Sequence, residues 1–211
     1  RSGLMFAAEN LDTIGLLTRT VDDADLLMSV LLNRPRSAII APETKPKIGF
    51  CRTHHWDSAL AETITAMEDS LKRLEQAGAE IIDITLPESF AGLSTARNAL
   101  NDFERSRVMA DLWQNERDQL STNIAKQLEN GTIMEYNTYR DAVTLANDSR
   151  AQLEGIFGDV DFCLAPAATG EASEGLGYTG DPQFQGCWTI LHVPTISLPT
   201  HKGPNGLPVG I

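Results

Sequence analysis

Lys47-Ile-Gly-Phe-Cys51 and Glu80-Ile-Ile-Asp-Ile-Thr-Leu86 are two short apolar runs that decide the fold class of this chain of 211 residues. The second run alternates apolar and polar side chains, which is the two-residue period of a half-buried strand. The first run is continuously apolar after its lysine, and Pro87 ends the second. With a helix between them, these strands form a βαβ unit over residues 47–86, so we expect them to be parallel.

The helix between the two strands is predicted from its apolar spacing. Asp57 or Ser58 is the expected cap at its start. Apolar residues then recur at intervals of four and three, which places them on one helical face. They are Leu60, Ile64, Met67, Leu71 and Leu74. Gly78 follows at the expected carboxyl end, where a residue that accepts positive φ is favoured.

The flanking segments give further predictions. Thr20-Val-Asp-Asp23 has the form of a capping box, and the helix after it is apolar nearly all round, so we expect it to be buried. A connector rich in proline runs from Arg34 to Pro46, and residues 89–157 are helical with a break at Asn130-Gly131. One helical face should carry Tyr139, Val143, Ala146, Leu153 and Phe157.

The last third of the chain contains shorter elements. Val160–Ala165 is predicted as a strand, and 184–192 as a short helix. Thr195–Leu198 is predicted as another strand, and Gly203–Leu207 as a turn. The glycine-rich loop 166–182 is long enough to suggest a functional role.

Composition excludes several classes of function. Seventeen basic and 29 acidic residues give a formal net charge of −12, which repels nucleic-acid backbones and anionic membranes. We therefore expect no nucleic-acid or membrane partner. The three cysteines form no Cys-x-x-Cys pair, which argues against a disulfide framework or a zinc site and favours a reducing compartment such as the cytoplasm. No apolar run reaches the roughly 18 residues that a membrane span needs.

Several stretches together resemble the amidase signature family of amide hydrolases. They are Ser2-Gly-Leu4, Leu11-Asp-Thr-Ile-Gly15, Leu17-Thr-Arg-Thr-Val-Asp-Asp-Ala24, Asp161-Phe-Cys-Leu-Ala-Pro166, Trp188-Thr-Ile-Leu-His-Val-Pro-Thr-Ile-Ser-Leu-Pro199 and Gly203-Pro-Asn-Gly-Leu-Pro-Val-Gly210. Their order also fits the family, although Leu16 stands where the family usually has proline.

The resemblance implies a mixed β-sheet covered by helices. Residues 1–211 would be the C-terminal part of one amidase-like domain, with 47–86 as a βαβ lobe and 89–157 as a helical segment. The family converts a carboxamide to a carboxylate and ammonia through an acyl-serine, using a Ser–cis-Ser–Lys triad and no metal or organic cofactor. That lysine and both serines are expected upstream of Arg1, so no catalytic residue is assigned here and the chain alone is expected to be inactive.

The candidate site residues in this sequence are therefore expected to support the catalytic residues or to bind substrate. Asp12, Thr18 and Arg19 would buttress the serine loop, or simply fix their own loop through an Asp12–Arg19 pair or backbone hydrogen bonds. Trp188, Pro166 and Thr169 are candidates for substrate binding, although a tryptophan is more often part of a core.

Other constellations are weaker. His54 and His55 would point to opposite sides of an extended chain, which argues against a shared metal ion. Ser94 begins a helix and lacks a nucleophile-elbow motif, and Cys187 has no identifiable orienting group. The competing hypothesis is a noncatalytic module that binds a small molecule or a partner. In either case, exposed strand edges favour association into homo-oligomers.

Overall fold

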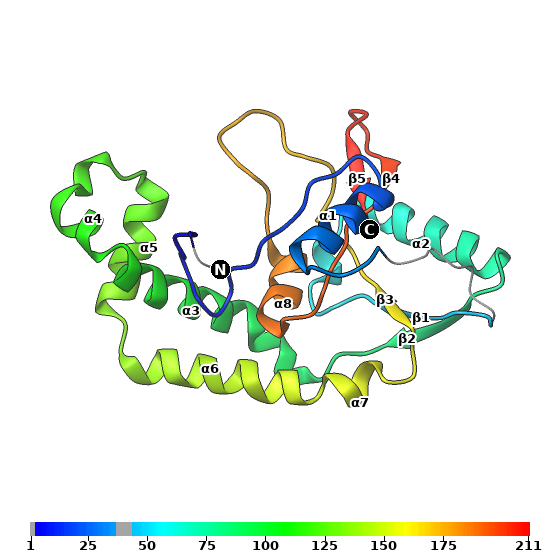
Figure 1. The fold of residues 1–211 in the computed structure, drawn as a ribbon, viewed down its shortest axis with the longest axis horizontal. Helices are drawn as coiled ribbons and strands as arrows, with labels where there is room; N and C mark the ends of the chain where they lie inside the picture. Colours follow the sequence, from blue (N-terminus) through cyan, green and yellow to red (C-terminus); the bar gives the residue numbers. More distant parts are fainter. Residues whose placement is uncertain (1–2, 37–43) are drawn as a thin grey trace.

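The computed structural model describes residues 3–36 and 44–211 and forms an α/β fold (Figure 1). Arg1, Ser2 and the middle of the predicted connector, 37–43, lie outside the described residues. The strands are β1 (Lys47–Cys51), β2 (Glu80–Ile84), β3 (Phe162–Leu164), β4 (Pro199–Lys202) and β5 (Pro208–Gly210). The α-helices are α1 (Val21–Leu31), α2 (Ala61–Gln76), α3 (Leu93–Val108), α4 (Ala110–Asn115), α5 (Thr122–Ile133), α6 (Tyr136–Ala151), α7 (Leu153–Phe157) and α8 (Gln183–Leu191). Three short 3₁₀ turns are η1 (Trp56–Ser58), η2 (Glu88–Gly92) and η3 (Arg117–Gln119).

The predicted βαβ unit is confirmed. β1 pairs in parallel with β2, with Lys47 opposite Glu80, and β3 joins the other side of β1, also in parallel. The strand order is β2-β1-β3. β4 and β5 form a separate antiparallel pair.

Alternation along β1 separates two hydrophobic cores. Ile48 and Phe50 point to one face, where Met67 of α2 covers them. Cys51 points to the other face and joins the larger core that α3, α6 and α8 form. Both faces of this sheet are therefore covered, which explains the continuous apolar run in β1.

The start of α2 differs from the prediction. Asp57 and Ser58 lie in the turn η1, and α2 begins at Ala61 after Leu60, with no side-chain cap. The Leu60 N–H instead donates to the carbonyl oxygen of Thr169 at 2.7 Å, so the residue at the helix start is held by a distant loop. The carboxyl end is as expected, since Gly78 has φ of +100°.

The predicted break at Asn130-Gly131 is wrong, because both residues lie inside α5. A Cβ on Gly131 would stand 1.8 Å from the backbone oxygen of Asp102 in α3. The glycine therefore serves close packing of α5 on α3. The chain breaks later, at Met134 and Glu135, between α5 and α6.

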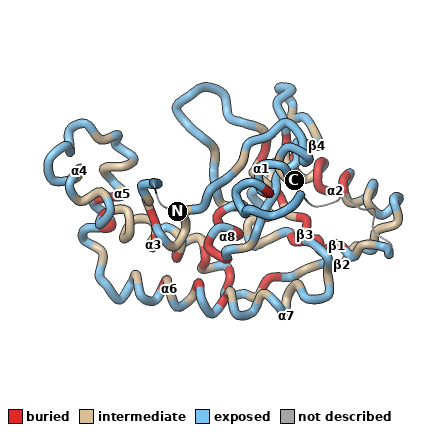
Figure 2. The backbone as a smooth tube through the Cα atoms, viewed as in Figure 1, coloured by how far each residue is buried: buried red, intermediate tan, exposed pale blue. Residues whose placement is uncertain are grey.

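The prediction that the first helix is buried is also wrong. Thr20 does cap α1 by accepting from the Asp23 N–H, yet only Ser29 of this helix is buried. Most of α1 is coloured as exposed in Figure 2. Its large apolar residues are among the exposed ones, with Val30 at 70%. No other described helix or strand packs extensively on α1, so within residues 3–36 and 44–211 its apolar surface has little cover.

The predicted strand at Thr195–Leu198 is displaced along the chain. Leu198 exchanges two backbone hydrogen bonds with Ile211, and regular pairing begins at Pro199. The position of the partner strand β5 sets these bounds. The predicted turn at Gly203–Leu207 connects β4 to β5, and this hairpin packs against α2.

Candidate functional site at the carboxyl edge of the sheet

The three segments that follow the parallel strands meet beyond the carboxyl edge of the sheet. This is where parallel α/β sheets commonly place ligand sites. The segment after β1 supplies His55, the segment after β2 leads into α3, and the segment after β3 is the loop 166–182 and α8.

His55 and Ser94 are joined across two of these segments. His55 Nε2 lies 2.9 Å from Ser94 Oγ, and the His55 ring meets the Phe184 ring edge-on at 6.5 Å. The turn that places His55 contains Thr53, which has φ of +59° and accepts the His55 N–H on its hydroxyl. The sequence gives no sign of this contact, because 39 positions separate His55 and Ser94 along the chain.

Arg97 lies on the same face of α3 as Ser94, one helical turn further on. Its guanidinium lies against the backbone of α8, where a Cβ on Gly186 would stand 2.7 Å from an Arg97 nitrogen. Burial lowers the pKa of Arg97, and the charge of Asp181 opposes this shift. Asp181 itself accepts the Gln183 N–H at 2.9 Å, at the start of α8.

A nucleophile needs a base, an orienting group and donors for the oxyanion. The described residues supply the pair of Ser94 and His55, but no described carboxylate hydrogen-bonds His55. The geometry instead presents a hydroxyl bonded to an imidazole, with a guanidinium on the same helix one turn further on. Such a set can bind an anionic or polar group.

The loop 166–182 is anchored at its start. Thr63 Oγ1 donates to the Ala168 carbonyl at 3.3 Å, which adds to the Leu60–Thr169 hydrogen bond. Pro166 is buried and Thr169 is half-buried, whereas residues 172–179 are exposed and arch away from the sheet (Figure 1). Thr169 is therefore held through its backbone oxygen at the start of α2.

Glu171 connects this loop to the turn between β4 and β5. Its carboxylate accepts the Asn205 N–H at 2.8 Å, the Asn205 side-chain amide and the Leu207 N–H at 3.0 Å. Desolvation would raise the pKa of Glu171, but the hydrogen bonds from Asn205 and Leu207 outweigh it and leave this pKa below its ordinary value.

Replacing Glu171 with glutamine should loosen the connection between loop and hairpin. Glutamine keeps one acceptor oxygen but loses the charge, so amide hydrogen exchange at Asn205 and Leu207 should become several-fold faster. Since the folded-state pKa of Glu171 is lowered, the wild-type connection should be intact above its ordinary pKa and be lost as the pH falls through the lower folded-state value. Glu174→Gln, in the exposed part of the same loop, is the matched control; equal exchange in both variants would refute the connection.

Trp188 lies in α8 and is 8% exposed. Its ring packs at 6.3 Å from the Phe157 ring, within the larger core. Cys187 beside it is also buried, and burial followed by the charge of Cys51 raises the pKa of its thiol to about 12. A thiol with so high a pKa stays protonated near neutral pH, which removes Cys187 as a nucleophile.

The predicted supporting residues are not gathered into one cluster. Asp12 Oδ2 accepts the N–H groups of Ala7 and Ala8, at 2.6 and 3.1 Å, and no described ion pair joins it to Arg19. Thr18 Oγ1 donates to the Thr20 carbonyl at 2.9 Å. Asp12 thus fixes its own loop through backbone hydrogen bonds, which is one of the two structural alternatives for this segment.

Asn10 is a positioning residue that the sequence did not reveal. Its backbone N–H donates to Glu104 of α3 at 2.9 Å, and Tyr139 of α6 donates to the same carboxylate at 3.0 Å. Desolvation and the Glu104 hydrogen bond raise the pKa of Tyr139 to about 12. The Asn10 carbonyl oxygen also lies 2.6 Å from His192 Nε2, so this network fixes the N-terminal segment on the helical layer.

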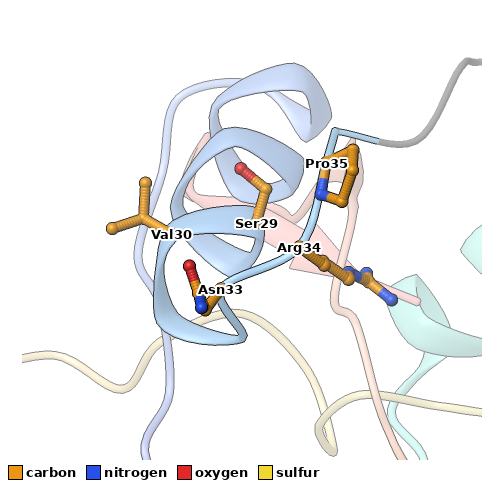
Figure 3. Close-up of a pocket in the computed structure, with 5 residues that line it drawn as sticks. All are labelled: Ser29, Val30, Asn33, Arg34 and Pro35. Atoms are coloured by element: carbon orange, nitrogen blue, oxygen red, sulfur yellow. The ribbon is translucent and has the colours of Figure 1, made fainter.

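Two surface hollows lie elsewhere. One, of about 480 Å³, is lined at the end of α1 by Ser29, Val30, Asn33, Arg34 and Pro35 (Figure 3). Val30 and Arg34 point away from each other there, so their side chains do not converge on a ligand. The other, of about 290 Å³, is lined by Leu4, Met5, Phe6, Asp12, Thr13 and Ile14.

Residues 3–36 and 44–211 contain no group of His, Cys, Asp and Glu side chains arranged to hold a metal ion. Their helices are all too short or too polar to cross a membrane.

The parallel sheet and its helical layers define an α/β protein, with a polar cluster at the carboxyl edge of the sheet. The family model described as Amidase matches residues 1–211. The chain therefore belongs to the amidase family, whose solved members include amidase signature enzymes.

Individual relatives agree with this assignment. Glutamyl-tRNA(Gln) amidotransferase subunits from Koribacter versatilis and Thermodesulfovibrio yellowstonii are 25% and 26% identical; both alignments cover 100% of this chain but only 53% and 52% of the relatives. A crystal structure of an amidase matches with a TM-score of 0.79 and 25% identity, over 92% of this chain and 46% of its own. A bacterial aryl acylamidase of the amidase signature family shares the fold, with a TM-score of 0.67 and 21% identity. The match covers 92% of this chain and 47% of the acylamidase chain. The chain thus spans about half the length of the relatives that it matches.

Proposed function

We propose that this chain is the C-terminal part of an amidase that hydrolyses a carboxamide to a carboxylate and ammonia through an acyl-serine. The Ser–cis-Ser–Lys triad would come from sequence upstream of Arg1. This part would contribute the substrate-facing edge, with Trp188, Pro166 and Thr169 near the substrate and Asp12, Thr18 and Arg19 as supports.

The family match over all 211 residues is the observation that carries this proposal. The half-length coverage of the relatives supports a division of the catalytic machinery between this chain and sequence that it does not contain. The described residues agree with it, since their best nucleophile–base pair, Ser94 and His55, lacks an orienting carboxylate. The free cysteines and their spacing support a reducing, cytoplasmic setting as part of the proposal.

Ammonia release from a panel of amides is the direct test. The 211-residue chain should release none above background, whereas a chain extended upstream through the native coding sequence should be active. Replacing either upstream serine with alanine should abolish that activity. Ammonia release by the 211-residue chain alone would contradict the proposal, and an extended chain that binds amides without turnover would favour a noncatalytic module.

Self-association is expected for the 211-residue chain, because the apolar surface of α1 has little cover from the residues that the structure describes. Sedimentation velocity should show a sedimentation coefficient that rises with concentration. Replacing both Leu27 (43% exposed) and Val30 (70% exposed) with glutamate should reduce this rise, because charge opposes burial of the patch. The same double change at Leu112 and Ile133, which are exposed on the distant α4 and α5, is the control. A strictly monomeric wild type at high concentration would refute the expectation.

A further inference from the structure

Arg97 is a partly desolvated cation without an ion-pair partner in the described part of the chain. It takes part in none of the six ion pairs found there. One of its terminal nitrogens donates to Asn98 Oδ1 at 2.9 Å. The charge of Asp181 acts on it from beyond ion-pair distance. Because a guanidinium has five N–H donors, most of its hydrogen-bonding capacity is open to a ligand.

Two other desolvated arginines show how the fold ordinarily satisfies such groups. Arg107 donates to the carbonyl oxygens of Phe103 and Gly131, at 2.9 and 2.7 Å. Arg150 donates to the Ile190 carbonyl and to Asn147, each at 2.9 Å. Burial lowers the pKa of both, as it does for Arg97. Arg97 differs because it has no backbone carbonyl partner among the described residues.

The surroundings of Arg97 are arranged for an anion. Ser94 is one turn away on α3, and its hydroxyl is held by His55 from the segment after β1. The backbone of Gly186 supports the guanidinium from α8. Cation, hydroxyl and imidazole therefore lie where all three connections meet beyond the sheet, the position at which such sheets bind ligands.

We propose that Arg97, together with Ser94 and His55, binds the carboxylate group of a small molecule. A planar guanidinium matches a carboxylate through two parallel hydrogen bonds. One cation facing the nearby Asp181 suits a monoanion better than a doubly charged phosphate. The identity of the ligand rests on the proposed function: the amide substrate, or the acid product, would carry this carboxylate.

Direct binding to the 211-residue chain tests the proposal without turnover. The His55 ring and the Ser94 backbone amide serve as NMR reporters while sodium acetate is added at constant ionic strength, and sodium phosphate is added in a parallel series. Acetate should shift both signals saturably. Arg97→Gln should weaken acetate binding about tenfold or more, since it removes a charge-assisted contact, and Arg97→Lys should weaken it less, because the charge remains but the fork is lost.

Arg73→Gln, an exposed position on α2, is the matched control and should bind acetate as the wild type does. An unchanged acetate affinity in Arg97→Gln, or no saturable shift in the wild type, would overturn the site. A response to phosphate alone would overturn its assignment to carboxylates. Since no activity is measured, failure of this site leaves the amidase proposal standing, and an inactive extended enzyme leaves the binding result unaffected.

Discussion

Replacing Gly131 with alanine is expected to lower the stability of the fold by at least about 3 kcal/mol, the upper end of ordinary overpacking. The new Cβ would lie 1.8 Å from the Asp102 oxygen and 2.5 Å from its carbonyl carbon. Both are backbone atoms of α3, so no side chain can move aside to relieve the clash. The helices would have to separate, which would also weaken the hydrogen bond from Arg107 to the Gly131 carbonyl.

Thermal unfolding followed by circular dichroism measures this effect. A loss of about 3 kcal/mol corresponds to a fall in Tm of about 6–12 °C for a chain of this size. Gly155→Ala is the matched control, since Gly155 also lies in a helix but has open space where its Cβ would stand. Alanine should be neutral or stabilising there, by up to about 1 kcal/mol. Equal Tm values for the two variants would show that α3 and α5 do not pack as described.

Replacing Phe184 with alanine is expected to destabilise the protein by about 3–5 kcal/mol through the cavity that it leaves. The ring is completely buried and lies where α8 meets the segment after β1, with its edge contact to His55. Truncation should therefore also free the His55 ring, so that its NMR line broadens or shifts even at temperatures where the variant is folded.

Urea unfolding gives the change in free energy, and Tyr178→Ala gives the comparison. Tyr178 is 59% exposed in the loop 166–182, so its loss should change stability by no more than about 0.5 kcal/mol. If Phe184→Ala were as mild as Tyr178→Ala, the contact between α8 and the His55 segment would be wrong, and with it the arrangement of the candidate site.

Local sequence patterns were sufficient where neighbouring residues decide the structure. Four features depend only on steric and hydrogen-bonding preferences within one or two turns of chain. They are the two-residue alternation of β2, the face of α2 that carries Met67, the cap at Thr20 and the positive φ of Gly78. The family resemblance also lay in contiguous motifs, so it could be seen in the sequence and was confirmed by the match over all 211 residues.

Patterns failed where a distant segment decides the outcome. An Asn-Gly pair such as Asn130-Gly131 is typical of a helix break. Here Gly131 instead allows close packing of α5 against the backbone of Asp102 in α3. The apolar sequence of α1 predicts burial, yet burial requires a covering element, and none among the described residues packs closely on it. The start of α2 is fixed by Thr169, more than one hundred residues away, and no local capping signal reports that contact.

The sequence by itself determined the α/β class, the parallel βαβ unit and the amidase family, because each depends on residue identity and short-range order. Only the tertiary structure decided that the side chains of His55 and Ser94 meet, with Arg97 one turn further along α3. The segments after β1 and β2 come together because parallel strands end at the same edge of the sheet, and the contact between Arg97 and Gly186 requires α3 and α8 to pack closely. Such convergence depends on strand order and helix packing, and these leave no periodic signal in the chain.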